Sequence, residues 1–232
     1  MTIRQLPLDI ELPQSATLAG FVGPTNFSVR AAVAELVDVR GQRLFLHGPE
    51  ASGKSHLLQA ACRAVSANGG RAVYLPLTQF GRDAADVVSG LGEMDLVCVD
   101  DIATVGGQRD TEIAFVGLAD MLQARGGRLL TADREPPASL NLALADLASR
   151  LAAGGIQATA SLNDTDKQAL LIARAAQRGI TLSSATADWL LNHGPRDISS
   201  LIGALDRLGE ASLSAKRRIT IPFAKRVLAE MP

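Results

Sequence analysis

The chain has 232 residues, 47% of them hydrophobic, and its 23 basic and 24 acidic side chains give a net charge of −1. This length suits one α/β domain with a smaller second domain, and the balanced charge argues against a strongly basic nucleic-acid-coating protein. No uninterrupted run of eighteen apolar residues occurs, and Asp9 and Glu11 make the start of the chain unlike a signal peptide. We therefore expect a cytoplasmic globular protein without a membrane span.

Residues 1–17 are expected to form a short peptide and a linker ahead of the folded core. The segment "RQLPLDI" places Leu6 and Leu8 on either side of Pro7, whose ring favours extended backbone. Two apolar side chains on a short extended segment can anchor it in a pocket of a partner. The segment could instead pair as an edge strand or remain disordered, and the residues alone leave these alternatives open.

Short apolar runs alternate with helical patterns from about residue 43 to residue 163. This alternation is typical of an α/β fold with a parallel sheet and crossover helices. The third run is apolar at every position before its two acids, which predicts a central strand covered on both faces. We predict five strands, at residues 43–47, 72–77, 95–100, 128–132 and 156–160, and helices near residues 54–67, 79–90, 110–125 and 139–152.

The segment "GPEASGKS" fits the phosphate-loop pattern G-x-x-x-x-G-K-[ST] at every defined position. Gly48 and Gly53 allow backbone N–H groups to turn toward phosphate oxygens, and the helix that follows adds the positive end of its dipole. Lys54 supplies a charge for the β- and γ-phosphates, and Ser55 supplies a hydroxyl for magnesium. A chance match on a helix-capping loop is the alternative, but a strand before the loop and an apolar helix after it favour binding of ADP or ATP with Mg²⁺.

The segment "LVCVDD" ends the third predicted strand with two carboxylates. Asp100 is the expected partner of the magnesium ion, and Asp101 stands where a catalytic base or a water-orienting carboxylate would act. The alternative is a pair of solvated acids at a strand end. Open α/β sheets bind ligands at the carboxyl ends of their strands, which favours the functional interpretation.

After residue 163 the pattern contains helices only, with Gly179 and the pair Gly194-Pro195 as breaks. We therefore predict a small all-helical domain at residues 164–232.

Four motifs occur in a fixed order: the phosphate loop, the strand ending in two aspartates, "LLTADREPP", and "DLASRL". Together with the helical segment after them, they resemble the AAA+ ATPases of the replication-initiator DnaA group. The resemblance extends over about residues 18–231. It implies a P-loop AAA+ core at residues 18–163 with a parallel five-stranded sheet, followed by a helical lid domain at residues 164–232.

The resemblance also implies further residues at the nucleotide. Phe21 and Val22 match the N-terminal stretch that borders the base, and His56 directly follows the phosphate loop. The segment "TAD" places Thr131 and Asp133 at the sensor position, where a polar side chain faces the γ-phosphate and the attacking water. Of the pair, Asp133 is the expected catalytic residue.

The segment "LASRL" places Arg150 at the arginine-finger position, where a guanidinium acts in trans on the nucleotide of a neighbouring molecule. Such fingers contribute ~10³ to 10⁵ in rate in systems where they have been measured. The alternative is an arginine that only contacts the last carbonyl groups of its helix. The surrounding motifs favour the finger.

One position departs from the pattern of this group. Its lid usually carries an arginine in a sequence like R-x-L-x-G-A-L, whereas this chain reads "ISSLIGAL" with Ser199 at that place. Arg196 lies three residues earlier, on the same helical face, and could reach the nucleotide instead. A serine cannot replace the missing charge, so we expect weak intrinsic ATPase activity.

The resemblance is strongest to short DnaA-like proteins that inactivate the initiator after replication starts. In these regulators a QL-x-L peptide docks on the sliding clamp, and Gln5, Leu6 and Leu8 stand at the matching places. The implied function is negative regulation of chromosome replication initiation, in which DnaA and the sliding clamp, the beta subunit of the DNA polymerase, are the partners. DNA contact would be indirect or weak, and the sequence leaves open a homodimer or homo-oligomer.

Two other functions remain open from the sequence. A self-sufficient AAA+ ATPase that acts like a helicase loader would turn over ATP with Asp101 and bind a helicase in place of the clamp. A pure adaptor would hold nucleotide permanently and promote no hydrolysis.

Overall fold

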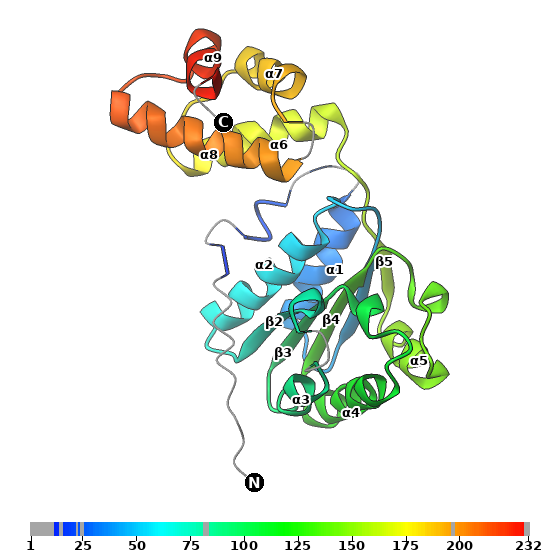
Figure 1. Cartoon of the computed structure of the whole chain (residues 1–232). Helices are drawn as coiled ribbons and strands as arrows, with labels where there is room; N and C mark the ends of the chain where they lie inside the picture. The colour runs from blue at the N-terminus through cyan, green and yellow to red at the C-terminus, as the bar shows by residue number, and fades with distance from the viewer. Residues whose placement is uncertain are drawn as a thin grey trace. The chain divides into compact units, whose positions relative to one another are not determined.

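The computed structural model describes residues 12–13, 16–21, 23, 26–80, 84–195 and 198–229, without the side chain of Ser199. These residues form two compact units (Figure 1). The first unit contains the residues up to Phe21 and Asn26–Ala160, and the second contains Gly23 and the residues from Ser161 onward. None of the described helices combines the length and the apolar composition that a membrane span requires.

The first unit is built on five parallel strands in the order β2-β3-β4-β1-β5. This confirms the predicted parallel five-stranded sheet, and each strand lies within two residues of its predicted bounds. The strands are β1 (Arg43–His47), β2 (Ala72–Pro76), β3 (Leu96–Asp100), β4 (Arg128–Asp133) and β5 (Ile156–Ala158).

Helices cover both faces of the sheet (Figure 1). Along β3, Leu96 and Cys98 belong to one apolar core, whereas Val97 and Val99 belong to the other. β3 is therefore apolar on both faces because neither face meets water. The first core includes residues of α1 (Phe27–Asp38) and α2 (Lys54–Ala67), and the second includes residues of α3 (Ala84–Ser89), α4 (Arg109–Arg125) and α5 (Ala145–Ala152).

The helix predicted at residues 139–152 is wrong at its start, because α5 begins only at Ala145. Pro137–Ser139 form a 3₁₀ turn instead. The carboxylate of Glu112 then accepts hydrogen bonds from the N–H groups of Ala143 and Leu144. Since a side chain from α4 holds the backbone just before α5, the helix cannot extend toward the N-terminus.

Two further helices differ from the prediction. The helix expected near residues 79–90 is a 3₁₀ turn at Leu77–Gln79 followed by α3, and residues 81–83 lie outside the description. α1 is absent from the prediction, although its buried residues Val29, Val33 and Leu36 are spaced as on one face of a helix. The apolar spacing was sufficient to find this helix.

The second unit consists of helices around its own apolar core, as predicted for the lid. Asn163 caps the first helix by accepting a hydrogen bond from the N–H of Asp166 at 2.8 Å, and Ser183 caps the second. Leu182 and Ile219 form an isolated parallel bridge beside the helices. The helices are α6 (Asp164–Gln177), α7 (Ser184–His193), α8 (Ile198–Ala215) and α9 (Ile221–Ala229).

Candidate functional site

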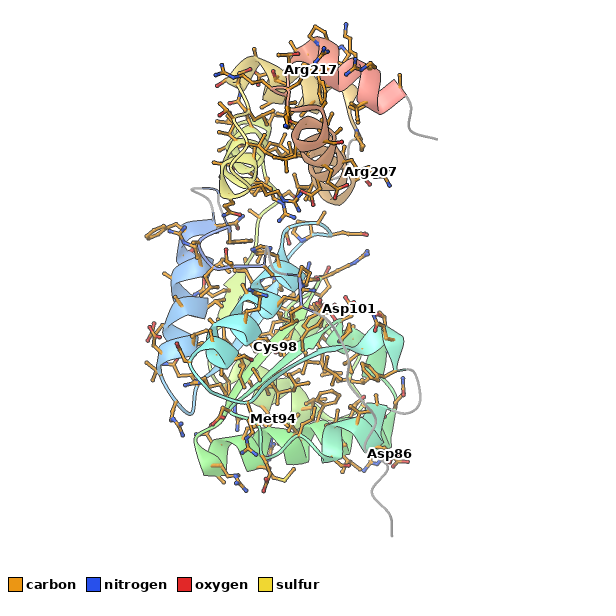
Figure 2. The ribbon with its side chains drawn as sticks, turned by 90° about the vertical axis from the view of Figure 1, so that its left-hand side faces the viewer. Asp86, Met94, Cys98, Asp101, Arg207 and Arg217 are labelled. Atoms are coloured by element: carbon orange, nitrogen blue, oxygen red, sulfur yellow. The ribbon has the colours of Figure 1, made fainter. Side chains whose placement is uncertain are left out.

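The strand order brings three predicted motifs together at the carboxyl edge of the sheet. β4 lies between β3 and β1, and the register pairs Asp100 with Ala132 and His47 with Asp133. The phosphate loop follows His47, so its first glycine is next to Asp133. In Figure 2, Met94 lies just before β3, Cys98 lies within it and Asp101 directly follows it, at this carboxyl edge. Parallel α/β sheets bind their ligands at this edge.

The two glycines of the phosphate loop are required by close approaches of the chain. A Cβ atom on Gly48 would lie 2.3 Å from the carbonyl oxygen of Thr159, and one on Gly53 would lie 2.5 Å from a ring carbon of Phe21. Gly53 also has a φ of 89°, in the left-handed region, and is the N-cap of α2. A glycine N-cap has no side chain to occupy the first N–H groups of α2, which leaves them for an anion.

Lys54 places a cation inside this loop. Its Nζ donates hydrogen bonds to the carbonyl oxygens of Gly48 at 2.6 Å and Pro49 at 2.8 Å, and the residue is only 8% exposed. Burial lowers the pKa of the ammonium, and the negative charge of Asp100 opposes that shift. The position is that of the P-loop lysine, which contacts β- and γ-phosphates in nucleotide-binding proteins.

Ser55 and Asp100 provide an oxygen pair that fits a magnesium ion. The Tyr74 hydroxyl donates to Oδ2 of Asp100 at 2.8 Å, and the side chains of Ser55 and Gln59 lie near the same hydroxyl. Burial and the neighbouring carboxylate raise the pKa of Tyr74, so it stays protonated and remains a donor. Mg²⁺ prefers hard oxygen ligands and completes its shell with phosphate oxygens and water, and this donor set meets that requirement.

Tyr74→Phe is expected to raise the Mg²⁺ concentration needed for half-maximal binding of a fluorescent ADP analogue. The phenylalanine keeps the ring but leaves Oδ2 of the buried Asp100 without its donor. Loss of such an outer contact typically costs a metal site about 10- to 100-fold in affinity. Binding measured in excess EDTA serves as the control and should be unchanged. An unaltered Mg²⁺ midpoint would show that Tyr74 does not orient Asp100.

Asp101 and Asp133 occupy different environments at the same edge. Asp101 has a left-handed φ of 58° and a pKa raised by burial and by the charges of Asp100 and Asp133. In contrast, both oxygens of Asp133 are used, by the N–H groups of Ala103 at 2.6 Å and Arg134 at 2.7 Å. A fixed carboxylate beside one with a raised pKa suits a sensor next to a base.

Phe21 and His56 lie next to the end of the phosphate loop, near Gly53. Their rings stack with centroids 6.0 Å apart, and Nε2 of His56 is 2.9 Å from the carbonyl oxygen of Thr17. The Phe21 ring also lies against Gly53. The segment before α1 is thus held against the phosphate loop. The sequence predicts that this segment borders the adenine base of the nucleotide.

Some predicted residues are not placed by the structure. Gln5, Leu6 and Leu8 of the terminal peptide lie outside the described residues, as do Val22 and Arg196. Ser199 lies in the first turn of α8, and only its backbone is described.

Arg150 lies on α5, at the edge of the sheet opposite to the phosphate loop. β1 runs from Arg43 to His47, so Arg43 marks the amino edge. A Cβ atom on Gly154, just after α5, would lie 1.9 Å from the carbonyl oxygen of Arg43. Figure 1 shows α5 beside α4, away from the start of α2. Arg150 therefore does not share the site formed by Lys54 and Asp100.

The structure adds residues that the sequence prediction omits. Thr159 Oγ1 lies 2.7 Å from the Ser52 hydroxyl, which holds the phosphate loop against the strand next to it. Arg134 forms an ion pair with Glu50 of the loop at 2.7 Å. A polar residue directly after a strand was the only available signal for these two, because the contacts depend on the order of strands in the sheet.

Comparison with known proteins gives matches over both units. Residues 12–158 match the family of bacterial DnaA ATPase domains, and residues 164–228 match the Hda lid domain. An uncharacterized protein of Haemophilus influenzae is 38% identical over 97% of this chain and 98% of its own length.

Solved structures of replication initiators share the fold. Domain III of Thermotoga maritima DnaA is 19% identical, with a TM-score of 0.78 over 96% of this chain and 100% of that one. A replication initiator DnaA bound to AMPPCP and single-stranded DNA is 22% identical, with a TM-score of 0.72 over 88% of this chain and 69% of that one.

Proposed function

The chain belongs to the bacterial DnaA ATPase family, and we propose that it is an Hda-type regulator that acts on DnaA together with the DNA-loaded sliding clamp. One observation carries the proposal. Arg150, at the finger position, lies at the edge of the sheet opposite to the chain's own phosphate loop. An arginine placed there suits the nucleotide of another molecule.

In this proposal the chain's own site holds ADP or ATP with Mg²⁺. The loop from Gly48 to Lys54 binds the phosphates, Ser55 and Asp100 hold the ion, and Phe21 borders the base. The bound nucleotide supplies anionic phosphates that neutralise Lys54 and the start of α2. AMPPCP bound to a DnaA of the same fold supports a nucleotide at this place.

The regulatory step takes place on DnaA. Hydrolysis of ATP concentrates negative charge on the γ-phosphate and the bridging oxygen, and a guanidinium brought close stabilises that charge. Arg150 supplies the guanidinium, so that DnaA converts its ATP to ADP and stops initiating replication. In this proposal the chain acts through the surface that carries Arg150, and its own bound nucleotide stabilises the conformation of that surface.

The peptide of Gln5, Leu6 and Leu8 would bring the regulator to the clamp. Deletion of residues 1–10 is expected to abolish retention of the protein on immobilised sliding clamp, because Leu6 and Leu8 are the apolar anchors. The deletion should leave bound nucleotide unchanged when it is released by denaturation and identified by chromatography. Equal retention of the truncated and full chains would contradict clamp docking through this peptide.

A further inference from the structure

α4 and α5 are joined by a set of charged contacts around Arg150. Asp120 on α4 binds the guanidinium with both carboxylate oxygens, at 2.8 Å from Nε and 2.9 Å from Nη2. Asp146 on α5 accepts a hydrogen bond from Nη1 of the same side chain. The Arg150 side chain is only 24% exposed, and its charged end meets the two carboxylates.

A second carboxylate of α4 fixes the start of α5. Glu112 is fully buried, and its oxygens accept hydrogen bonds from the N–H groups of Gly107 at 2.9 Å, Ala143 at 2.9 Å and Leu144 at 2.7 Å. Leu144 is the N-cap residue of α5. A buried carboxylate with several backbone donors is a strong, geometrically defined contact.

The two carboxylates lie on one side of α4. Residues eight positions apart in an α-helix are about 80° apart around the axis, so Glu112 and Asp120 lie on the same half of the helix, and both meet α5 or the residues just before it. Glu112 holds the backbone before α5, and Asp120 holds the side chain of Arg150 near the end of α5. α4 therefore restrains α5 at both ends.

Asp120 remains charged next to two arginines. The hydrogen bond from Arg150 is the main cause that lowers the pKa of Asp120, with a further contribution from Arg43. Nη2 of Arg43 donates to the carbonyl oxygen of Ala119 at 2.8 Å, beside Asp120. The carboxylate is thus ionised at neutral pH and held in place for Arg150.

We propose that Asp120 is a positioning residue for Arg150. Its carboxylate holds the plane of the Arg150 guanidinium in the orientation that α5 presents to a partner's nucleotide. The inference rests on the proposed function and deepens it. A carboxylate that binds Nε and Nη2 together fixes the plane of the guanidinium. The Asp146 carboxylate accepts a single hydrogen bond from within its own helix, so a phosphate can replace it while Asp120 keeps its two contacts.

Asp120→Ala is expected to lower the clamp-dependent rate of hydrolysis of DnaA-bound ATP by about 10-fold or more, because small misplacements of a reacting group cost up to 10²-fold. Asp146→Ala removes the same charge from the same guanidinium and should change the rate by less than about threefold, as expected for a single contact within one helix. In an Arg150→Ala background, Asp120→Ala should have no further effect. Clamp retention and thermal stability should match the unaltered chain.

Equal losses for Asp120→Ala and Asp146→Ala would overturn the positioning role, as would a further loss in the Arg150→Ala background. A direct readout is hydrogen exchange of the Arg150 Nε–H measured by NMR, which needs no partner. Exchange should be slow in the unaltered chain and in Asp146→Ala, and fast in Asp120→Ala. If Arg150→Ala leaves DnaA hydrolysis unchanged, the proposed function fails, whereas the exchange measurement still decides whether Asp120 holds the guanidinium.

Discussion

Replacement of Arg150 by alanine is expected to lower clamp-dependent hydrolysis of DnaA-bound ATP by about 10³-fold or more, the range found for arginine fingers. The same variant should bind ADP and ATP with unchanged affinity, since α5 ends beside Arg43 and the phosphate loop begins beyond His47. The rate is measured as labelled phosphate released from DnaA loaded with γ-labelled ATP in the presence of clamp on DNA.

Two matched variants separate the role of the finger from general effects of charge. Arg125→Ala removes an arginine of the same unit, one that pairs with Glu93 at 3.3 Å, and should leave the rate unchanged. Arg150→Lys keeps the charge but loses the planar fork of donors, so it should restore only a small part of the activity. A wild-type rate in Arg150→Ala would contradict the finger role.

Replacement of Lys54 by alanine is expected to have the second largest effect, a loss of nucleotide affinity of about 10- to 100-fold. A hydrogen bond to a charged group contributes roughly 1.5–3 kcal/mol, which corresponds to that range of dissociation constants. The loss should be similar for ADP and ATP if the β-phosphate is the main contact, and isothermal titration with each nucleotide measures it.

Lys216→Ala provides the matched control, because Lys216 is an exposed lysine that no predicted site contains. Its nucleotide affinity should equal that of the unaltered chain. Undiminished affinity in Lys54→Ala would show that the loop does not hold the phosphates. Loss of affinity together with loss of the folded state would be detected by circular dichroism, and Lys54→Met, which keeps the volume of the side chain, would then replace alanine.

The sheet could be predicted from the sequence because its strands are buried on both faces. Leu96 to Val99 are apolar without interruption. When such runs recur between helical segments, few structures other than buried parallel strands fit the pattern. The phosphate loop could be predicted for a similar reason. Its glycines, Lys54 and Ser55 lie close together in the sequence and form the phosphate site by local geometry, so their spacing in the chain is enough to predict that site.

Contacts between distant segments could not be predicted. The start of α5 depends on Glu112, which lies on α4 and reaches the backbone of Ala143 and Leu144 only after both helices have packed. The contact of Tyr74 with Asp100 could not be predicted either, because nothing in the sequence of β2 indicates that its tyrosine will donate to a carboxylate of the neighbouring strand. A single sequence gives the polarity of such residues but not their partners.

The position of Arg150 could be established only from its sequence motif and the fold together. Its motif could be recognised along the chain, but its position at the amino edge depends on the strand order and on the contact between Gly154 and Arg43. The combination distinguishes an arginine that serves the chain's own nucleotide from one that serves a neighbour.

The most direct test of the proposed function is to determine which protein's ATP is hydrolysed. DnaA is loaded with γ-labelled ATP and this protein with unlabelled ADP, and labelled phosphate is measured with clamp on DNA; the labels are then exchanged between the two proteins. If Arg150 acts on DnaA, release of label from DnaA is rapid and depends on this protein, whereas release is slow when the label is bound to this protein. Rapid release from this protein, with none from DnaA, would contradict the proposed action on DnaA and identify a self-sufficient ATPase.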